Sequence, residues 1–515
     1  MCGIAGIINY RNDPVKDILN MNRAMLHRGP DAGDYWLDPE RKVVLGHRRL
    51  SIVDLSANGA QPMKSADGRY VIVYNGEIYN YQELEQKLRA DGCELHLRGT
   101  SDTEVILEAF SFYGMEKTLS LMKGMFAIAL YDRQEQQLYL TRDRVGEKPL
   151  YYGMVNGAFA FASDIECIRQ IEGFSNQVNR AVFPLYFQYG YIPAPYSIYE
   201  KIYKLEPGKT LRLDCKTLDY KIQTYWSMTE VALNGQKNRF TGSEEEAAGE
   251  LERLLKDAIK GQMIADVPLG AFLSGGIDSS LVVSLMQSLS QEKIKTFTIG
   301  FDVDKYNEAQ YAKEIAAHLG TEHTELYVTS QDAFTIMQHM PDSFTEPFAD
   351  SSQIPTMLVS KMTREHVTVA LSGDAGDELF CGYTTYMVAE EEMSKFRKRF
   401  HRIPEPLRHG AAKIGGALAG PFTPTLYKIG NYLAIDTLEQ AHADMGLEDA
   451  RTAFLAGGGG RPEDSNHSYR GGLLKEPVEN LMLMDLLQYH PDDILVKVDR
   501  AGMFYSLENR VPMLD

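Results

Sequence analysis

Cysteine is scarce in this sequence, and no long apolar segment is present. The cysteines are odd in number and show no metal-ligand spacing, which is typical of a chain that folds in a reducing compartment. No apolar run approaches the ~18–20 residues of a membrane helix, and the first residues lack the basic start and apolar stretch of a signal peptide. We therefore predict a cytoplasmic protein with no membrane insertion. The five cysteines are Cys2, Cys93, Cys167, Cys215 and Cys381.

Positive charge is also in deficit, because 53 Lys and Arg residues face 71 Asp and Glu residues and the formal net charge is −18. A strongly acidic chain is repelled by the phosphate backbone, so we expect no nucleic-acid partner. The remaining composition is ordinary for a globular protein, with 44% hydrophobic and 24% charged residues. A chain of 515 residues is too long for a single core and predicts two domains.

The most informative segment is Ser274–Ser280, which reads Ser-Gly-Gly-Ile-Asp-Ser-Ser. It follows an apolar run, Val267–Leu273, that predicts a buried strand, and it leads into Leu281–Met286, which predicts a helix. Glycines and small hydroxyl residues at a helix N-terminus favour an anion cradle, because the backbone can approach a phosphate and the helix dipole attracts negative charge. The lysine of a GxxxxGK[ST] loop is missing. A Gly-Gly turn without a ligand is the alternative interpretation.

A second feature lies at the start of the chain, which reads Met1-Cys2-Gly3. If Met1 is removed, Cys2 carries its thiol beside a free α-amine, whose ordinary pKa of about 7.7–8.0 is close to working pH. The amine can then serve as the general base for the thiol, as in other N-terminal nucleophiles. Lipidation is a poor alternative, since no signal peptide precedes Cys2 and position two is not glycine. Alone, however, a cysteine at position two is usually accidental.

Four further segments strengthen this interpretation, and in order they are His27–Asp31, Gly46–Asp54, Tyr74–Asn80 and Arg98–Glu104. With Cys2 they resemble the class II, or N-terminal-nucleophile, glutamine amidotransferase domain. The residue types suit that chemistry, since Arg49 can grip the carboxylate of glutamine and Asp102 its α-ammonium group.

The amidotransferase resemblance assigns Cys2 as the nucleophile. The Asn75 side chain and the Gly76 backbone N–H become the donors that stabilise the oxyanion. The implied glutamine-binding set is Arg49, Leu50, Ser51, Ile52, Val53, Asn75, Gly76, Glu77 and Asp102.

The Ser274–Ser280 loop resembles the SGGxDS loop of ATP-pyrophosphatases, which split ATP between its α- and β-phosphates. Together, the two signatures resemble the glutamine-hydrolysing asparagine synthetase family, and the resemblance runs from Met1 to Asp515. It implies that ammonia from glutamine attacks an acyl-adenylate made from ATP and aspartate, giving asparagine, AMP and pyrophosphate. Further matching stretches are Gly124–Asp132, Glu346–Asp350, Leu371–Glu378 and Leu507–Asp515.

The same resemblance implies ATP as a substrate and Mg²⁺ as a cofactor. Asp278 and Asp377 are hard oxygen ligands suited to magnesium. For Asp377, an acidic residue that complements a helix dipole is the alternative interpretation. The implied ATP-binding set is Leu273, Ser274, Gly275, Gly276, Asp278, Ser279, Ser280, Ile299, Ser372 and Gly373.

The acceptor is where the sequence leaves alternatives open. Asp374, which we predict to be catalytic, stands where well-known family members carry a Glu that is tied to adenylate formation. Its shorter side chain leaves room for another carboxylate acceptor, such as a uronic acid of a surface polysaccharide.

Family members usually continue for many tens of residues beyond Asp515, so we expect the second domain to be C-terminally truncated. A glutaminase-only or regulatory protein is a further alternative, and a homodimer is kept as a possible assembly.

The periodicity of the chain predicts an α+β N-terminal-nucleophile sandwich over 1–212 and a linker over 213–242. An α/β doubly wound parallel-sheet ATP-pyrophosphatase domain is predicted over 243–515, with a less regular helical part at 385–475. Expected strands are Ile4–Asn9, Val43–His47, Val71–Tyr74, Phe126–Asp132, Gln137–Thr141, Leu269–Leu273, Lys295–Phe301, Thr324–Val328 and Val367–Leu371. Expected helices are Tyr81–Asp91, Asp102–Tyr113, Glu244–Met263, Leu281–Ser288, Asn307–Leu319 and Gln353–Arg364.

Overall fold

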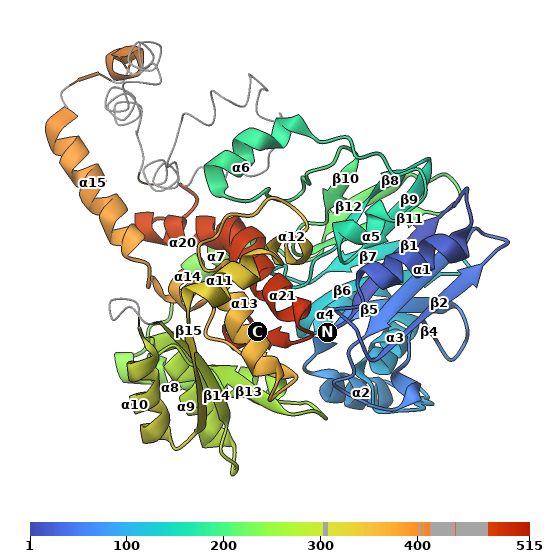
Figure 1. The fold of residues 1–515 in the computed structure, drawn as a ribbon, viewed down its shortest axis with the longest axis horizontal. Helices are drawn as coiled ribbons and strands as arrows, with labels where there is room; N and C mark the ends of the chain where they lie inside the picture. Colours follow the sequence, from blue (N-terminus) through green and yellow to red (C-terminus); the bar gives the residue numbers. More distant parts are fainter. Residues whose placement is uncertain (302–306, 401–402, 405, 412–437, 439–471) are drawn as a thin grey trace.

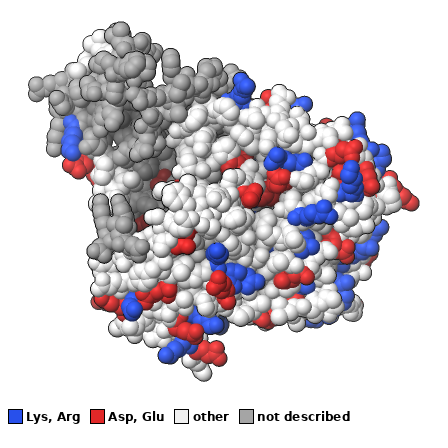
Figure 2. Space-filling model, viewed as in Figure 1, with Lys and Arg blue, Asp and Glu red and all other residues white. Residues whose placement is uncertain are grey.

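A computed structural model describes residues 1–301, 307–400, 403–404, 406–411, 438 and 472–515. Figure 1 shows antiparallel sheets in the N-terminal part of the chain and a separate sheet with its helices in the C-terminal part. None of the described helices is long and apolar enough to cross a membrane. On the face shown in Figure 2, basic and acidic side chains are interspersed over the described surface.

The N-terminal unit is built on two six-stranded antiparallel sheets, with the strand orders β10-β8-β9-β1-β3-β2 and β12-β11-β7-β6-β5-β4. Apolar side chains from both sheets, such as Ile4, Val73 and Phe161, form one buried cluster between them. The strands are β1 (Gly3–Ile8), β2 (Ala32–Asp38), β3 (Val43–Arg49), β4 (Met63–Lys64), β5 (Tyr70–Ile78), β6 (Gly124–Asp132), β7 (Gln137–Arg142), β8 (Tyr151–Val155), β9 (Ala158–Ala162), β10 (Ile202–Lys204), β11 (Lys209–Asp214) and β12 (Tyr220–Thr224).

Helices cover the outer face of each sheet, which completes the predicted α+β sandwich. One cluster joins the first sheet to α1 (Pro14–Ala24) and α5 (Ile165–Arg169). Another joins the second sheet to α2 (Tyr81–Ala90), α3 (Asp102–Tyr113) and α4 (Met115–Leu121). The α3 helix begins where the Ser101 side chain accepts from the Thr103 N–H, and this cap fixes the backbone of Asp102.

The expected linker over 213–242 is wrong at its N-terminal end. The β11 strand runs to Asp214, and β12 pairs with it in register from Lys209↔Thr224 to Leu213↔Tyr220, so the sheet extends to Thr224. This edge strand reads Tyr-Lys-Ile-Gln-Thr and all five of its residues are exposed, so its apolar alternation is too short to be a strong strand signal in the sequence. The chain then continues as α7 (Met228–Lys237) and α8 (Glu244–Gln262).

The C-terminal unit contains a five-stranded sheet with the order β15-β14-β13-β16-β17. All its pairings are parallel, as predicted. The order reverses between β13 and β16, and ligands of such sheets bind beyond the carboxyl ends of the strands at this switch point. The strands are β13 (Leu269–Phe272), β14 (Lys295–Phe301), β15 (Glu322–Val328), β16 (Val369–Leu371) and β17 (Glu508–Arg510).

The predicted helices on described residues are present, but α9 begins at Ile277, four residues before the predicted start at Leu281. The helices of this unit are α9 (Ile277–Leu289), α10 (Ala309–Leu319), α11 (Ser330–Met337), α12 (Met340–Ser343), α13 (Gln353–Arg364), α14 (Gly376–Phe380), α15 (Thr384–Phe400), α20 (Pro477–Leu487) and α21 (Leu495–Phe504). Most of the helical part expected over 385–475 lies outside the described residues.

The two units share a continuous hydrophobic core. Met1, Leu50 and Tyr79 of the N-terminal unit belong to the same buried cluster as Leu273 and Met503 of the C-terminal unit. Backbone hydrogen bonds cross the same boundary, for example from the Asp266 N–H to the Ile52 carbonyl at 2.8 Å. The relative position of the two units is therefore fixed by close packing.

Candidate active sites

Cys2 lies just before β1, in contact with β5 and with the loop that follows β3. Its backbone N–H donates to Asn75 Oδ1 at 2.9 Å, and its thiol lies 3.9 Å from the Leu50 carbonyl oxygen. Burial raises the pKa of the thiol, so Cys2 needs a base to become a nucleophile. The Asn75 Nδ2 atom is buried and has no hydrogen-bond partner among the described residues. This amide therefore offers a donor beside the thiol.

Gly76, the other predicted oxyanion donor, follows Asn75 on β5 and pairs with Phe126 of β6. A Cβ atom at this position would lie 2.1 Å from the Met125 carbonyl oxygen, so only glycine permits this close strand pairing. The two predicted oxyanion donors are thus adjacent on one rigid strand.

Arg49, at the end of β3, is held by the loop that follows it. Its guanidinium donates to the Ser56 carbonyl at 2.8 Å and also to the Asp54 carbonyl. A Cβ atom at Gly59 would lie 2.0 Å from Arg49 Nη2, so the glycine makes room for this side chain. The loop is fixed at Ser51, whose N–H donates to Asp31 Oδ2 at 2.7 Å.

Two carboxylates of the predicted glutamine site are buried near Cys2. Burial raises the pKa of Asp102, whose Oδ2 accepts from the Tyr74 hydroxyl at 2.9 Å and the Ile78 N–H at 3.0 Å. The pKa of Glu77 is raised well above its usual range by burial and then by the charge of Asp102. Each carboxylate therefore disfavours the charge of the other, and a bound ammonium group would relieve both.

The other predicted glutamine contacts lie in the loop after β3. Leu50 and Ile52 are buried in the core that joins the units, and Val53 packs at its margin. Of these residues, Leu50 contacts the Cys2 thiol through its carbonyl oxygen.

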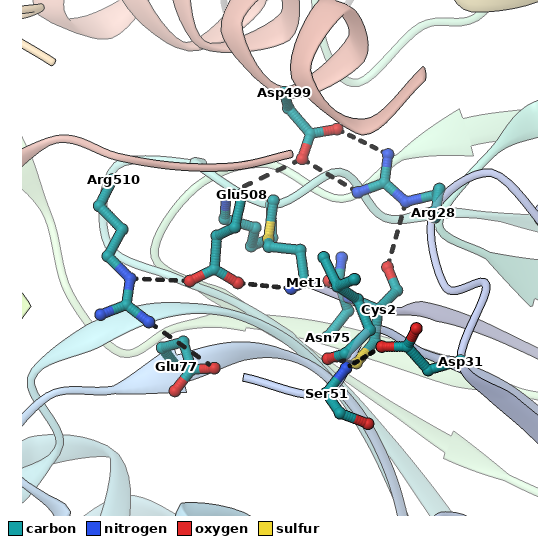
Figure 3. A network of polar contacts seen from close by, with 12 residues as sticks. Met1, Cys2, Arg28, Asp31, Ser51, Asn75, Glu77, Asp499, Glu508 and Arg510 are labelled. Atoms are coloured by element: carbon teal, nitrogen blue, oxygen red, sulfur yellow. Dashed lines mark hydrogen bonds and ion pairs between the residues drawn. The ribbon is translucent and has the colours of Figure 1, made fainter. Parts of the chain in front are cut away.

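Sequence reasoning assigned no role to a network of charged groups near Cys2, in which Arg28 and the Met1 ammonium contact residues of the C-terminal unit (Figure 3). Arg28 donates from Nε to the Cys2 carbonyl at 3.1 Å and from Nη1 and Nη2 to Asp499 at 2.8 and 3.0 Å. The Met1 ammonium donates to Glu508 Oε2 at 2.5 Å, and Arg510 donates to Glu508 Oε1 at 2.7 Å. The partners of the two interdomain contacts are 471 and 507 residues apart, so no local motif could reveal them.

The predicted phosphate loop, Ser274–Ser280, lies after β13, and its last four residues form the first turn of α9. Gly275 has a φ of +87°, which favours glycine, and a Cβ there would lie 2.9 Å from Tyr311 Cβ on α10. Ser274 and Ser279 pair through their hydroxyl oxygens at 3.0 Å, and the Gly276 N–H donates to Ser274 Oγ at 3.2 Å. The Ser280 hydroxyl donates to the Gly276 carbonyl at 2.6 Å. The turn is thus braced internally at the N-terminus of a 13-residue helix.

The second predicted loop, Ser372–Glu378, packs directly on the first. A Cβ atom at Gly373 would lie 2.5 Å from the Ser279 backbone nitrogen, and one at Gly376 would lie 2.3 Å from Asp278 Cγ. The Ser372 hydroxyl is buried and has no partner among the described residues, although its N–H donates to the Arg510 carbonyl at 3.0 Å. Both loops therefore meet at the switch point of the sheet.

Acidic side chains gather where the loops meet. The pKa of Asp278 is raised by burial and then by Glu378 and Asp374, and that of Asp377 is raised by burial and then by Asp278. Glu378 is engaged by the His490 ring and by the Tyr383 hydroxyl, at 3.0 and 2.8 Å. The described residues contain no group of three His, Cys, Asp or Glu side chains arranged to hold a metal ion by themselves.

This donor set fits magnesium, which is commonly bound by one or two carboxylates together with water and substrate phosphates. Asp278 and Asp377 supply two such carboxylates. Burial and then Asp278 raise the pKa of Asp377, and a cation bound between the two carboxylates would offset that repulsion.

Of the remaining predicted nucleotide contacts, Leu273 follows β13 and its N–H donates to the Phe297 carbonyl at 2.9 Å. Ile299 lies on the neighbouring β14 strand, where it packs against a different cluster that contains Val328 and Ile336. The structure therefore places Leu273 beside the loops and Ile299 one strand away.

A small cavity of about 20 Å³ lies between the two units, and its walls include Tyr151, Glu346 and Arg500. Both carboxylate oxygens of Glu346 contact the N-terminal unit. Oε2 accepts from the Tyr151 hydroxyl at 2.7 Å and lies 2.9 Å from Lys204 Nζ, and Oε1 accepts from the Ile198 N–H at 2.7 Å. The sequence pattern identified the Glu346–Asp350 stretch but not these contacts.

Comparisons with known proteins match a separate family model to each of the two units. Residues 1–226 match the model of a glutamine amidotransferase domain, and residues 250–515 match that of asparagine synthase. The chain is 35% identical to the putative asparagine synthetase [glutamine-hydrolyzing] 2 of Methanocaldococcus jannaschii, over 98% of each chain. It is 33% identical to asparagine synthetase [glutamine-hydrolyzing] 1 of Bacillus subtilis, over 100% of this chain and 79% of the relative. A more distant relative, amidase chry2 of Gibberella zeae, is 26% identical over 100% of this chain and 81% of its own.

Two domain matches that together span nearly the whole chain, and relatives above 30% identity over their common length, establish the family. The chain therefore belongs to the glutamine-hydrolysing asparagine synthetase family of ligase-type amidotransferases.

Proposed function

We propose that this protein transfers the amide nitrogen of glutamine to aspartate in a reaction driven by ATP, giving asparagine, glutamate, AMP and pyrophosphate. The observation that carries the proposal is the pairing of two sites across one core. Cys2 lies on one side with Asn75, whose Nδ2 has no hydrogen-bond partner among the described residues, and the two packed glycine loops lie on the other side. Relatives named as glutamine-hydrolysing asparagine synthetases support the choice of substrates.

In the glutaminase half-reaction, the α-amine of Cys2 becomes free once Met1 is removed, and it takes the proton of the thiol. The sulfur attacks the side-chain amide carbon of glutamine, and the Asn75 Nδ2 and Gly76 N–H groups stabilise the oxyanion. Collapse of this intermediate breaks the C–N bond, and the amine returns the proton to the departing ammonia. Water then hydrolyses the thioester to glutamate.

Recognition of glutamine is assigned to the charged residues around Cys2. The Arg49 fork suits the α-carboxylate, and its contacts with the Ser56 and Asp54 carbonyls keep the fork oriented. Asp102 and Glu77 suit the α-ammonium group, whose positive charge relieves the repulsion between two buried carboxylates.

In the synthetase half-reaction, an oxygen of the acceptor carboxylate attacks the α-phosphate of ATP and pyrophosphate leaves. Ammonia then attacks the acyl carbon and AMP departs. The backbone N–H groups of the Ser274–Ser280 loop and the N-terminus of α9 suit the phosphates. Asp278 and Asp377 would hold magnesium, which supplies positive charge that stabilises the departing pyrophosphate.

The identity of the acceptor depends on Asp374, whose charge lies among the carboxylates at the junction of the loops. Aspartate is the proposed acceptor, and a uronic acid or another carboxylate is the competing one.

The test is to assay the full chain with aspartate, ATP, magnesium and glutamine for asparagine and pyrophosphate. Cys2→Ala should abolish glutamate formation and retain asparagine synthesis from ammonium chloride. Asp278→Asn should have the opposite effect, stopping pyrophosphate release while glutamine hydrolysis continues. Pyrophosphate release with a uronic acid but not with aspartate would change the acceptor. No pyrophosphate release with any carboxylate would refute the ligase proposal.

A further inference from the structure

The feature that leads further is the pair of carboxylates in the glutaminase site, Asp102 and Glu77. Burial raises the pKa of both, and the charge of Asp102 raises that of Glu77 further. Two neighbouring carboxylates in a buried place resist simultaneous ionisation, so one of them carries the charge when no ligand is bound. The identity of that residue decides how the site recognises the α-ammonium group of its substrate.

The hydrogen bonds favour Asp102 as the charged member of the pair. Its Oδ2 accepts from the Tyr74 hydroxyl at 2.9 Å and from the Ile78 N–H at 3.0 Å, and such donors stabilise an ionised carboxylate. Asp102 is also the first residue of α3, where the helix dipole favours negative charge. The one ion pair that the described residues give to Glu77 is with Arg510 Nη2 at 3.9 Å, which is too long for a hydrogen bond (Figure 3).

The Tyr74 side chain is held firmly in the position from which it donates. Its ring is buried and packs on Gly76, where an added Cβ atom would lie 2.9 Å from Tyr74 Cε2. The Tyr74 N–H donates to Gln61 Oε1 at 2.7 Å, and Gln61 Nε2 donates to Thr103 Oγ1 at 3.2 Å. Because Thr103 follows Asp102 in the chain, one buried amide ties together the two segments that carry the hydroxyl and the carboxylate.

The protonation of Tyr74 keeps its hydroxyl a donor at working pH. Burial and then the charge of Asp102 raise the pKa of Tyr74 well above its usual range. The hydroxyl therefore always has a proton to give to the carboxylate. The other titratable or charged groups that face the carboxylate pair are Tyr81 on α2, Glu508 and Arg510 on β17, and the Met1 ammonium group.

We propose that Tyr74 is a specificity-determining residue of the glutaminase site, because its hydroxyl holds the negative charge of the pair on Asp102 and thereby selects substrates with an α-ammonium group. This inference rests on the proposed function. Tyr74 acts through Asp102 and is therefore a positioning residue. In the empty site Glu77 keeps its proton, since it lacks the donors that Asp102 has.

The test compares glutamine with 4-carbamoylbutanoate, which is glutamine without its α-amino group. The full chain with Met1 removed hydrolyses each compound in the absence of ATP, and the ammonia released gives kcat/KM for both. The readout is the ratio of the two values, in which the titration of the Cys2 thiol and α-amine cancels because both substrates need them. Tyr79→Phe is the matched control for Tyr74→Phe, since it also removes a buried hydroxyl, but one with no hydrogen-bond partner among the described residues.

We expect Tyr74→Phe to lower the preference for glutamine about tenfold at neutral pH, equivalent to ~1.4 kcal/mol, whereas Tyr79→Phe should keep the wild-type ratio. Without its donor, the Asp102 carboxylate is protonated more easily. The acid limb of kcat/KM for glutamine should therefore move to higher pH by about one pH unit, while that for 4-carbamoylbutanoate stays in place. Equal losses with the two substrates would overturn the inference, because they indicate a purely structural role.

A second pair of variants tests the position of the charge without changing Tyr74. Asp102→Asn should lower the preference for glutamine about tenfold more than Glu77→Gln does, because only the former removes the ionised member of the pair. A larger loss in Glu77→Gln would overturn the inference.

The double variant shows whether the hydroxyl acts through the carboxylate. Tyr74→Phe should lower the ratio no further in an Asp102→Asn background, and an additional decrease there would overturn the inference. A wild-type chain that does not hydrolyse glutamine would refute the glutaminase half of the proposed function and this inference with it. Hydrolysis with an unaltered ratio in Tyr74→Phe would overturn this inference alone.

Discussion

The contact between the two glycine loops gives a direct test of how precisely Asp278 must be placed. In Gly376→Ala, the new Cβ would lie 2.3 Å from Asp278 Cγ, whereas real Cβ contacts essentially never fall below 3.0 Å. The carboxyl group must therefore retreat by at least the difference, about 0.7 Å. Because a misplacement of about 1 Å at a reacting centre can cost ~10²-fold in rate, we expect pyrophosphate release to fall by about that factor.

The assay compares pyrophosphate release with glutamine hydrolysis in the same preparation, and the glutaminase rate should remain at the wild-type level. Gly249→Ala is the control, because Gly249 lies on α8 with no atom within 4 Å of an added Cβ. Gly373→Ala should be at least as damaging, since its Cβ meets the Ser279 backbone, which cannot rotate away. A Gly376→Ala protein that releases pyrophosphate at the wild-type rate would refute the argument that this contact sets the geometry of Asp278.

Three other variants test separate parts of the structure. Asn75→Ala removes an oxyanion donor and should lower the glutaminase kcat by ~10²–10³-fold without affecting ammonium-dependent synthesis, as steady-state kinetics would show. Asp499→Asn breaks a fully buried ion pair with Arg28 and should cost ~3–5 kcal/mol in urea unfolding; a change near zero would contradict that role. Burial and then Asp350 raise the pKa of Asp493 to about 8, so the folded chain keeps a proton that the unfolded chain releases above about pH 4. Stability should therefore fall as pH rises from about 4 to 8, and Asp493→Asn should flatten that decline in urea midpoints measured at both ends.

The sequence predicted most of the elements whose residues carry a strong apolar signal. The strands near Val71–Tyr74 and Phe126–Asp132 are almost wholly buried, and their apolar runs reveal them. The β17 strand, Glu508-Asn509-Arg510, is also buried but consists of polar residues. Each of these side chains makes at least one hydrogen bond outside the strand ladder, as when Asn509 Nδ2 donates to the Val498 carbonyl at 2.9 Å. The composition of the strand therefore resembles that of a loop.

The candidate sites show the same contrast. Arg49, Asn75 and the two glycine loops lie in short motifs whose chemistry can be interpreted locally. Asp499 and Glu508 could not be predicted in this way, because they act through contacts with Arg28 and Met1, which lie hundreds of residues away in the sequence. Motifs thus predict the reacting groups, whereas the residues that join the two centres emerge only from the tertiary structure.

The late position of β17 in the sequence has a consequence for biosynthesis. The last strand of the N-terminal unit ends at Thr224. In the C-terminal unit, β16 ends at Leu371, and its partner β17 begins 137 residues later in the sequence, at Glu508. At roughly 5–20 residues per second, that interval on the ribosome lasts about 7–27 s. During it, the fully apolar β16 is an unpaired edge, which is a site for mispairing with other chains. The N-terminal unit can therefore fold before the C-terminal sheet has received its last strand, and a nascent chain interrupted before Glu508 would leave β16 as the edge of that sheet.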